Sequence, residues 1–217
     1  MIISEFKKRF YTSIFLIVLT ILLINSNLIL IYSIIVFGVL SLLEFFNLIQ
    51  KISRNIFFKT FFNSIFIIYV SIFSIFFLYF SIFLELKIFL FIFLFGCIFS
   101  DIGGYIFGNI FKGPKLTRIS PKKTISGSVG SFVFTFIIIG ASMFYFSDKI
   151  GYEVFILSFS TSLFCQLGDL FFSFLKRKAK VKDTGNFLPG HGGILDRLDG
   201  IFLGIPFGFL TFLFLYL

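Results

Sequence analysis

The 217-residue sequence contains no tryptophan, a single histidine, two cysteines and few charged residues. Charged side chains make up only 13% of the chain, whereas hydrophobic side chains make up 58% and the mean hydropathy is +1.07. These values exclude an ordinary soluble domain. Because Cys97 and Cys165 both lie within apolar runs, we expect buried packing thiols rather than a disulfide or a metal-binding pair.

Apolar runs that are long enough to cross the hydrocarbon core of a bilayer as helices recur from end to end. The sequence therefore predicts an all-α, polytopic integral membrane protein. We expect seven spans, at about residues 10–24, 28–48, 60–80, 86–108, 127–146, 152–175 and 197–217. In the last span, Gly200, Gly204 and Gly208 are spaced to let helices pack closely. We expect one transmembrane domain over 1–217, with N-terminal helices over about 1–85 and the polar motifs over about 86–217.

Positive charge is distributed unevenly between the loops. Seventeen of the 19 Lys and Arg residues lie in the N-terminus and the second, fourth and sixth connections, and only Lys87 and Lys149 lie elsewhere. Because cytoplasmic loops carry an excess of Lys and Arg, this predicts a cytoplasmic N-terminus and an odd number of spans. The same rule accounts for the net charge of +9 without nucleic acid as a partner. No small-residue cleavage site follows the basic N-terminus, so we expect the first helix to be retained.

Two carboxylates interrupt apolar runs, Asp101 in "FGCIFSDIGGYIFG" and Asp169 in "STSLFCQLGDLFFSFLKR". A charged side chain at the centre of a membrane helix costs about 3 kcal/mol, so such acids usually line a cavity or find a partner. A structural role, through hydrogen bonds across helices, is the alternative for both. Glu44 lies near a helix end, and we interpret it as interfacial and assign it no function.

Asp196 and Asp199 lie toward the same side of the membrane as the two intramembrane acids and the basic loops. They are three residues apart, which places both on one face where the last helix begins. Carboxylates near Lys and Arg suit a hard cation that also holds phosphate. Magnesium typically takes one or two carboxylates plus substrate phosphates, and Lys and Arg neutralise the remaining phosphate charge.

The segment "LPGHGGILDRLDG", residues 188–200, gathers the only histidine with several glycines and acids. Gly190, Gly192 and Gly193 let the backbone come close to a bulky anion, and the N–H groups of the following helix start point toward it. We interpret the segment as a phosphate-binding turn. His191 has three open roles: it could donate to phosphate, act in proton transfer, or make a structural hydrogen bond.

The basic loop "FKGPKLTRISPKKTISGSVG" is a second candidate for anion binding. Lys122 and Lys123 directly precede Thr124 and Ser126 at a helix start, where hydroxyls and N–H groups bind anions. The other basic residues of this loop are interpreted as general positive charge: Lys112, Lys115 and Arg118.

From residue 173 to residue 199 the chain reads "SFLKRKAKVKDTGNFLPGHGGILDRLD". This resembles the signature of the phosphatidate cytidylyltransferases, also called CDP-diacylglycerol synthases. The resemblance includes the S-x-x-K-R opening, Lys182-Asp183, the His-Gly-Gly turn and the closing D-R-x-D. Upstream, "SDIGGYIFG" and "ISPKKT" resemble family segments in the expected order, so the resemblance covers roughly the C-terminal half. The family often continues P-K-K-T with an aromatic residue and a glutamate, whereas Ile125-Ser126 follows here.

The resemblance implies a single catalytic domain that converts CTP and phosphatidate into CDP-diacylglycerol and pyrophosphate, with Mg²⁺ required and a second cation left open. It implies that Asp169 and Asp196 bind the metal and that Lys176 is their catalytic partner. Groups expected to bind substrate phosphates are Lys122, Lys123, Ser126, Arg177, His191 and Arg197. Supporting acids are Asp101, Asp183 and Asp199. We expect a multi-pass protein of the inner (cytoplasmic) membrane with its active site facing the cytoplasm, and a homodimer is left open.

Two other functions stay open at this point. A CTP-dependent polyprenol or lipid-alcohol kinase uses similar cation and phosphate chemistry but releases CDP rather than pyrophosphate. A cation-coupled transporter uses intramembrane acids to bind ions. The cytoplasmic clustering of the acids and the lack of an obvious inverted repeat favour the transferase.

Overall fold

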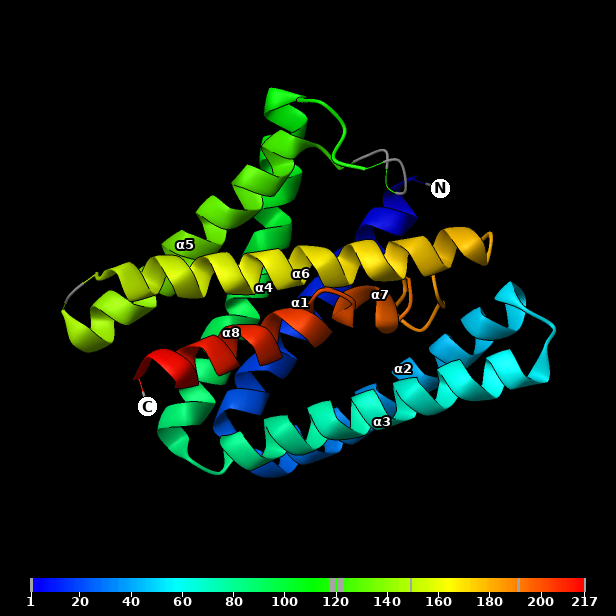
Figure 1. Ribbon diagram of the computed structural model, residues 1–217, viewed down its shortest axis with the longest axis horizontal. Coiled ribbons are helices and arrows are strands. Elements are labelled where there is room, and N and C mark those ends of the chain that lie inside the picture. Colours follow the sequence, from blue (N-terminus) through cyan, green and yellow to red (C-terminus); the bar gives the residue numbers. More distant parts are fainter. Residues whose placement is uncertain (1, 118–119, 121–122, 149, 191, 217) are drawn as a thin grey trace. The chain divides into compact units, whose positions relative to one another are not determined.

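The computed structural model describes residues 2–117, 120, 123–148, 150–190 and 192–216 (Figure 1). The described residues form α-helices joined by turns and loops, with isolated bridges at Lys115–Thr124 and Leu188–Gly192. This confirms the all-α prediction. The helices are α1 (Ile2–Asn25), α2 (Asn27–Ile52), α3 (Ile56–Ser81), α4 (Leu84–Phe111), α5 (Ile125–Ser147), α6 (Tyr152–Lys178), α7 (Leu195–Leu198) and α8 (Ile201–Tyr216).

Most of these helices are long and apolar enough to cross a membrane. Six stretches of the described chain meet this standard: α2, α3, α4, Ile125–Phe146 of α5, α6, and Leu195–Tyr216, which contains α7 and α8. The first predicted span corresponds to the shorter apolar stretch Phe10–Asn25 of α1. The protein is therefore a polytopic membrane protein, as predicted.

Helix ends coincide with residues that cap free backbone groups. The side chain of Ser26 accepts a hydrogen bond from Ile29 N at the start of α2 (3.4 Å). Asn55 accepts from Phe57 N at the start of α3 (2.9 Å), and Thr124 accepts from Gly127 N at the start of α5 (3.1 Å). Such oxygens pair with N–H groups that have no partner within the helix. The break between the first two predicted spans, at about 10–24 and 28–48, lies at Ser26 in the structure.

The chain divides into two compact units. The first consists of Met1–Lys87 and Leu175–Leu198, and the second of Ile88–Phe174 and Asp199–Leu217. The end of α6, the following loop and α7 thus group with the N-terminal helices, although their sequence motif suggested grouping with the C-terminal half. The prediction of one catalytic domain remains a prediction.

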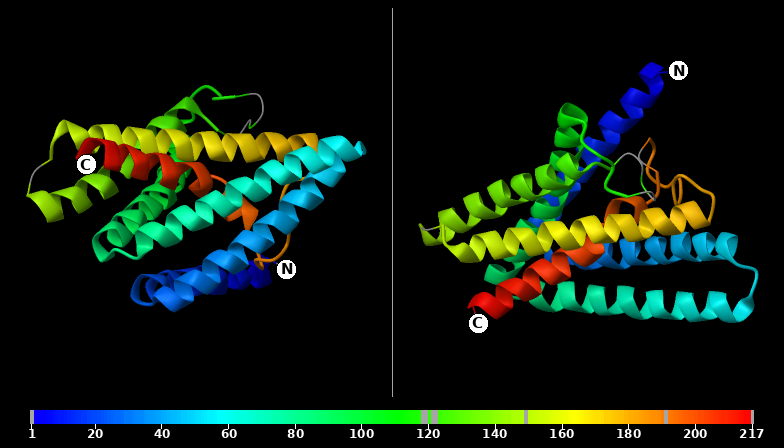
Figure 2. Two further views of the ribbon diagram at one scale, coloured as in Figure 1. Left: turned by 60° about the horizontal axis from the view of Figure 1, so that its bottom comes forward. Right: turned by 45° about the horizontal axis from the view of Figure 1, so that its top comes forward.

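In the first unit, α2 and α3 form an antiparallel pair that lies side by side in every view (Figures 1 and 2). Phe45 stacks on Phe66 between them, with ring centroids 3.9 Å apart. At the start of α4, the buried Lys87 donates from Nζ to Ile24 O and to Asn27 Oδ1, both at 2.7 Å. Lys87 therefore ties the connection between α1 and α2, and it is buried rather than part of an exposed loop.

In the second unit, α8 lies antiparallel to α6. Phe164 and Phe207 stack with their centroids 3.7 Å apart, and Ser160 and Thr211 share a hydrogen bond of 2.9 Å. A Cβ added to Gly200, Gly204 or Gly208 would collide with α6 or α4 side chains. This confirms the predicted close packing along the glycine stripe. The side chains met at Gly204 are Cys97 and Cys165, which are free, buried thiols as predicted.

Candidate active site

The signature residues of the first unit converge on Asp196, which lies in the first turn of α7. Lys176, in the last turn of α6, donates from Nζ to Asp196 Oδ1 at 2.8 Å. The other carboxylate oxygen, Oδ2, accepts from Thr184 N at 2.8 Å and from Gly193 N at 3.0 Å. The side chains of Lys176 and Asp196 are only 12% and 6% exposed. A shielded ion pair that carries further hydrogen bonds holds both groups in one geometry.

The chain reaches Asp196 through a tight turn in the signature loop. Leu188 N donates to Gly192 O at 3.0 Å, and Gly190 and Gly192 have φ values of 77° and 81°. Residues with a Cβ rarely adopt this conformation. A Cβ on Gly192 would also lie 3.0 Å from Asp196 Oδ2 and 3.5 Å from the Cβ of Asp183. The exposed Asp183 therefore lies beside the Asp196 cluster, and its supporting role remains a prediction.

The residue that sequence reasoning missed is Glu44 of α2. It is 1% exposed rather than interfacial, and it accepts hydrogen bonds from the hydroxyl of Thr184 (2.7 Å), Ile194 N (3.0 Å) and Leu195 N (2.9 Å). The signal was present, because Glu44 interrupts an apolar run just as Asp101 and Asp169 do.

The N–H groups at the start of α7 are used differently from the prediction. Gly193 N donates to Asp196, and Ile194 N and Leu195 N donate to Glu44. The expectation that this helix start directs its N–H groups at a phosphate is therefore wrong for these three groups, because carboxylates of the protein already occupy them. His191, predicted to meet phosphate in the same turn, lies outside the described residues.

In the second unit the candidate residue is Asp169 of α6. Lys123 forms an ion pair with Asp169 Oδ2, and Ser173 donates to Asp169 Oδ1 at 3.3 Å. The side chains of Lys123 and Asp169 are 26% and 27% exposed. Lys123 thus already contacts the carboxylate that was predicted to bind metal. Its neighbour Lys122 lies outside the described residues.

The loop that carries Lys123 is fixed at both ends. Leu116 N donates to Lys123 O at 2.8 Å, and Ile125 N donates to Pro114 O at 3.0 Å. Ser126 Oγ accepts from Gly113 N at 3.3 Å and shares a hydrogen bond of 3.0 Å with Thr124 Oγ1. Ser126 therefore closes the loop in this structure, and its predicted role in phosphate binding remains a prediction.

A row of polar side chains continues along α6 from Asp169 toward the N-terminal end of the helix. The hydroxyl of Ser128 on α5 donates to Gln166 Oε1, and Gln166 Nε2 donates to Ser162 Oγ at 3.0 Å. Ser162 in turn shares a 3.3 Å hydrogen bond with Ser100 of α4. These bonds connect three helices of the second unit, as interhelical polar contacts do in membranes.

The remaining predicted residues occupy different environments. Asp199 is 7% exposed and accepts from Gly200 N at 2.9 Å. Because α7 ends at Leu198 and α8 begins at Ile201, Asp199 lies in a turn, so the expectation of one helix that starts with both acids is wrong. Three other predicted site residues are exposed on their helices: Asp101, Arg177 and Arg197.

The ligand chemistry at Asp169 and Asp196 is compatible with magnesium. Among the described residues no three His, Cys, Asp or Glu side chains gather into a metal site of their own. Magnesium does not need such a cage, because it keeps waters and binds one or two carboxylates plus substrate phosphates. Asp169 already pairs with the ammonium group of Lys123, and its side chain is 27% exposed. Asp196 accepts bonds at about three of the four lone-pair positions of a carboxylate, which leaves one for a metal.

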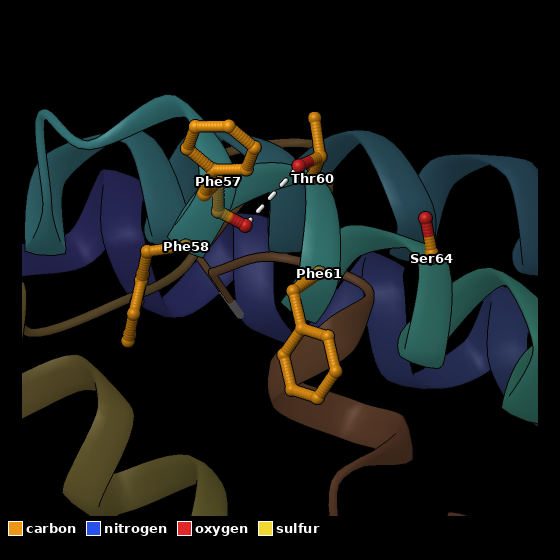
Figure 3. A pocket seen from close by; sticks show the side chains of 5 residues that line it. All are labelled: Phe57, Phe58, Thr60, Phe61 and Ser64. Atoms are coloured by element: carbon orange, nitrogen blue, oxygen red, sulfur yellow. Dashed lines mark hydrogen bonds between the residues drawn. The ribbon is translucent and has the colours of Figure 1, made fainter.

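The hollow on α3 contains none of these groups (Figure 3). It is lined by Phe57, Phe58, Thr60, Phe61 and Ser64 of this one helix. Thr60 Oγ1 donates within the helix, to Ile56 O at 3.0 Å and to Phe57 O at 3.1 Å. Phe57 and Phe61 are exposed on a helix that is long and apolar enough to cross a membrane, and no charged residue lines this hollow.

The fold and these clusters define a polytopic helical membrane protein that holds two partly buried carboxylate–ammonium pairs. The chain belongs to the cytidylyltransferase family, whose model matches residues 3–215. Among curated proteins it is similar to the phosphatidate cytidylyltransferase of Rickettsia felis, with 46% identity over 114 residues, 46% of this chain and 48% of that protein. The enzyme of the same name from Rickettsia bellii is 45% identical over 119 residues, 49% of each chain.

A further relative, the phosphatidate cytidylyltransferase of Staphylococcus aureus, is 47% identical over 110 residues, 49% of this chain and 42% of that protein. The chain spans about half the length of the curated relatives it matches.

Proposed function

We propose that the protein is a phosphatidate cytidylyltransferase, which transfers the cytidylyl group of CTP to phosphatidate. The observation that carries the proposal is the contact between Lys176 and Asp196, which joins the two ends of the signature at 2.8 Å. The proposal is supported by family membership and by relatives of that name at about 45% identity. Lipid and nucleotide substrates both suit a polytopic membrane protein with charged clusters.

In the proposed reaction a phosphatidate oxygen bonds to the α-phosphorus of CTP, and the bond from that phosphorus to the bridging oxygen of pyrophosphate breaks. A phosphate monoester has a second pKa of about 6, so the attacking oxygen is already largely ionised at neutral pH. The protein therefore needs no strong general base, and His191 need not supply one. Transfers of this kind depend mainly on positioning and on neutralising phosphate charge. Lys123 and Lys176 are the described ammonium groups that we assign to this task.

Magnesium, when bound, would supply positive charge that neutralises substrate phosphate. Asp169 and Asp196 are the residues that we assign to hold it. They lie in different compact units, so the idea that one ion contacts both carboxylates remains a prediction. A second cation and a homodimer are left open.

Purified protein supplied with labelled CTP and phosphatidate tests this function. We expect the label to enter lipid and pyrophosphate to be released in equal amounts, in a reaction that stops when magnesium is chelated. Release of CDP with phosphorylation of a lipid alcohol would instead identify a kinase. Ion flux in proteoliposomes without CTP turnover would identify a transporter.

We also propose that the protein spans the cytoplasmic membrane with its N-terminus and active site on the cytoplasmic side. The uneven distribution of basic residues supports this orientation. Single cysteines placed at the exposed Lys115 and Ile150 are expected to react with a membrane-impermeant thiol reagent from opposite sides. The native thiols do not interfere, because both are buried. Labelling of both positions from the same side would contradict the orientation.

A further inference from the structure

Glu44 joins α2 to two parts of the signature loop that are ten residues apart in sequence. On one part, the hydroxyl of Thr184 donates to Glu44 Oε2 at 2.7 Å. On the other, Ile194 N donates to Oε1 at 3.0 Å and Leu195 N donates to Oε2 at 2.9 Å. A carboxylate with 1% exposure and three donors is a fixed group, since an ionised carboxylate only accepts hydrogen bonds and each of these is charge-assisted.

The same two parts of the loop also hold Asp196. Thr184 donates its hydroxyl to Glu44 and its backbone N–H to Asp196 Oδ2. In the second part of the loop, three consecutive N–H groups bind the two carboxylates. Gly193 N donates to Asp196, and Ile194 N and Leu195 N donate to Glu44. Asp196 therefore receives two of its hydrogen bonds from backbone that Glu44 fixes in place.

Two glycines of the loop are explained by the same carboxylate. A Cβ added to Gly185 would collide with Glu44 Oε1, and a Cβ added to Gly193 would collide with both Glu44 oxygens and with the Thr184 hydroxyl. Neither glycine has a positive φ, so the requirement at these positions is close approach rather than backbone conformation. The loop packs its backbone directly against Glu44.

We propose that Glu44 is a positioning residue for nucleotidyl transfer. It fixes Thr184 and the start of α7, and through them it sets the position of Asp196 against Lys176. The proposal rests on the transferase function proposed above. Substituting groups that orient metal-binding side chains typically costs about 10- to 100-fold in activity or metal affinity.

Glu44→Gln is the most informative substitution, because it keeps the size of the side chain but removes part of its capacity to accept hydrogen bonds. One carboxylate oxygen becomes an NH₂ group, which cannot accept from the Thr184 hydroxyl or from a backbone N–H. We expect kcat per folded enzyme to fall by about 10- to 100-fold and the magnesium concentration at half-maximal rate to rise.

Two variants serve as matched controls for Glu44→Gln. Ser41→Ala removes a buried hydroxyl one turn earlier on α2, whose bond goes to Phe37 O of the same helix. Glu85→Gln removes the negative charge of an exposed glutamate. Both are expected to keep near-normal kcat and magnesium dependence. A Glu44→Gln enzyme with the kcat and magnesium dependence of Ser41→Ala would overturn the proposal.

A second variant changes a loop residue, Gly185, that packs against Glu44. Gly185→Ala is expected to displace the Glu44 carboxylate and to reproduce the loss of kcat, whereas Gly140→Ala is not, because its Cβ would meet Val154 Cγ1 at 3.6 Å. Both substitutions disturb the same contact between Glu44 and the loop. The kcat of the double variant Glu44→Gln with Gly185→Ala should therefore fall by a factor far smaller than the product of the two single factors. Multiplicative losses would show that the two positions act independently and would overturn the proposal.

Hydrogen exchange separates this proposal from the proposed reaction, because it needs no turnover. In Glu44→Gln, the amides of Ile194 and Leu195 are expected to exchange at least about tenfold faster than in the unsubstituted protein and in Ser41→Ala. If the unsubstituted protein does not make CDP-diacylglycerol, the proposed reaction fails but this measurement still reports on the loop. Unchanged exchange at both amides would overturn the positioning role even in an active enzyme.

Discussion

Asp196→Asn is expected to lower nucleotidyl transfer by at least about 100-fold while the protein still inserts into the membrane. The carboxylate of Asp196 accepts the Lys176 ammonium on one oxygen and the N–H groups of Thr184 and Gly193 on the other. Asparagine has one acceptor oxygen and one NH₂ donor, so it must lose either the ammonium or both N–H groups. It also lacks the negative charge that a hard cation requires.

The loss should appear in kcat rather than in the amount of folded protein. Lys176 would stay in a position that is only 12% exposed but without its charged partner, so its ammonium would no longer be held at Asp196. Asp148→Asn is the matched control, because Asp148 is an exposed aspartate with a φ of 53°, a conformation that asparagine tolerates. Turnover of Asp196→Asn equal to that of Asp148→Asn would contradict the assignment of Asp196.

The membrane-spanning helices were predictable from the sequence because their physics is local. Without water in the hydrocarbon region, an apolar run must satisfy its backbone internally as a helix. Polar residues such as Ser26, Asn55 and Thr124 then mark where helices begin, because their side chains accept from free N–H groups. Neither inference needs information about the partner of a helix.

The residues that were predicted incorrectly depend on contacts with distant parts of the chain. Nothing near Glu44 in the sequence indicates that Thr184, 140 residues later, will donate to it. A periodicity argument placed Asp196 and Asp199 on one helix. In the structure Gly200 N donates to the Asp199 side chain, and aspartate commonly replaces the helical pattern with such local bonds. The structure therefore shows that two carboxylates, Glu44 and Asp196, organise this part of the glycine-rich segment. A phosphate-binding role for the rest of the segment remains a prediction.

Asp169→Asn is expected to reduce turnover as severely, by at least about 100-fold, but with a different dependence on magnesium. Asp169 is more accessible than Asp196 and its described partners are side chains, Lys123 and Ser173, rather than backbone N–H groups. Its substitution should leave the signature loop intact and weaken cation binding directly. Activity measured against magnesium concentration should therefore show partial recovery at high magnesium for Asp169→Asn and little recovery for Asp196→Asn.

Lys123→Ala distinguishes a structural ion pair from a functional carboxylate at Asp169. If the role of Asp169 were only to neutralise Lys123, then combining Asp169→Asn with Lys123→Ala would restore turnover, because no unpaired charge would remain. We expect no recovery, since the double variant still lacks the metal-binding carboxylate and also lacks an ammonium assigned to substrate phosphate. Lys115→Ala, an exposed charge in the same loop, should remain near normal. Near-normal turnover of Asp169→Asn with an unchanged magnesium requirement, or its restoration by Lys123→Ala, would remove Asp169 from the metal site.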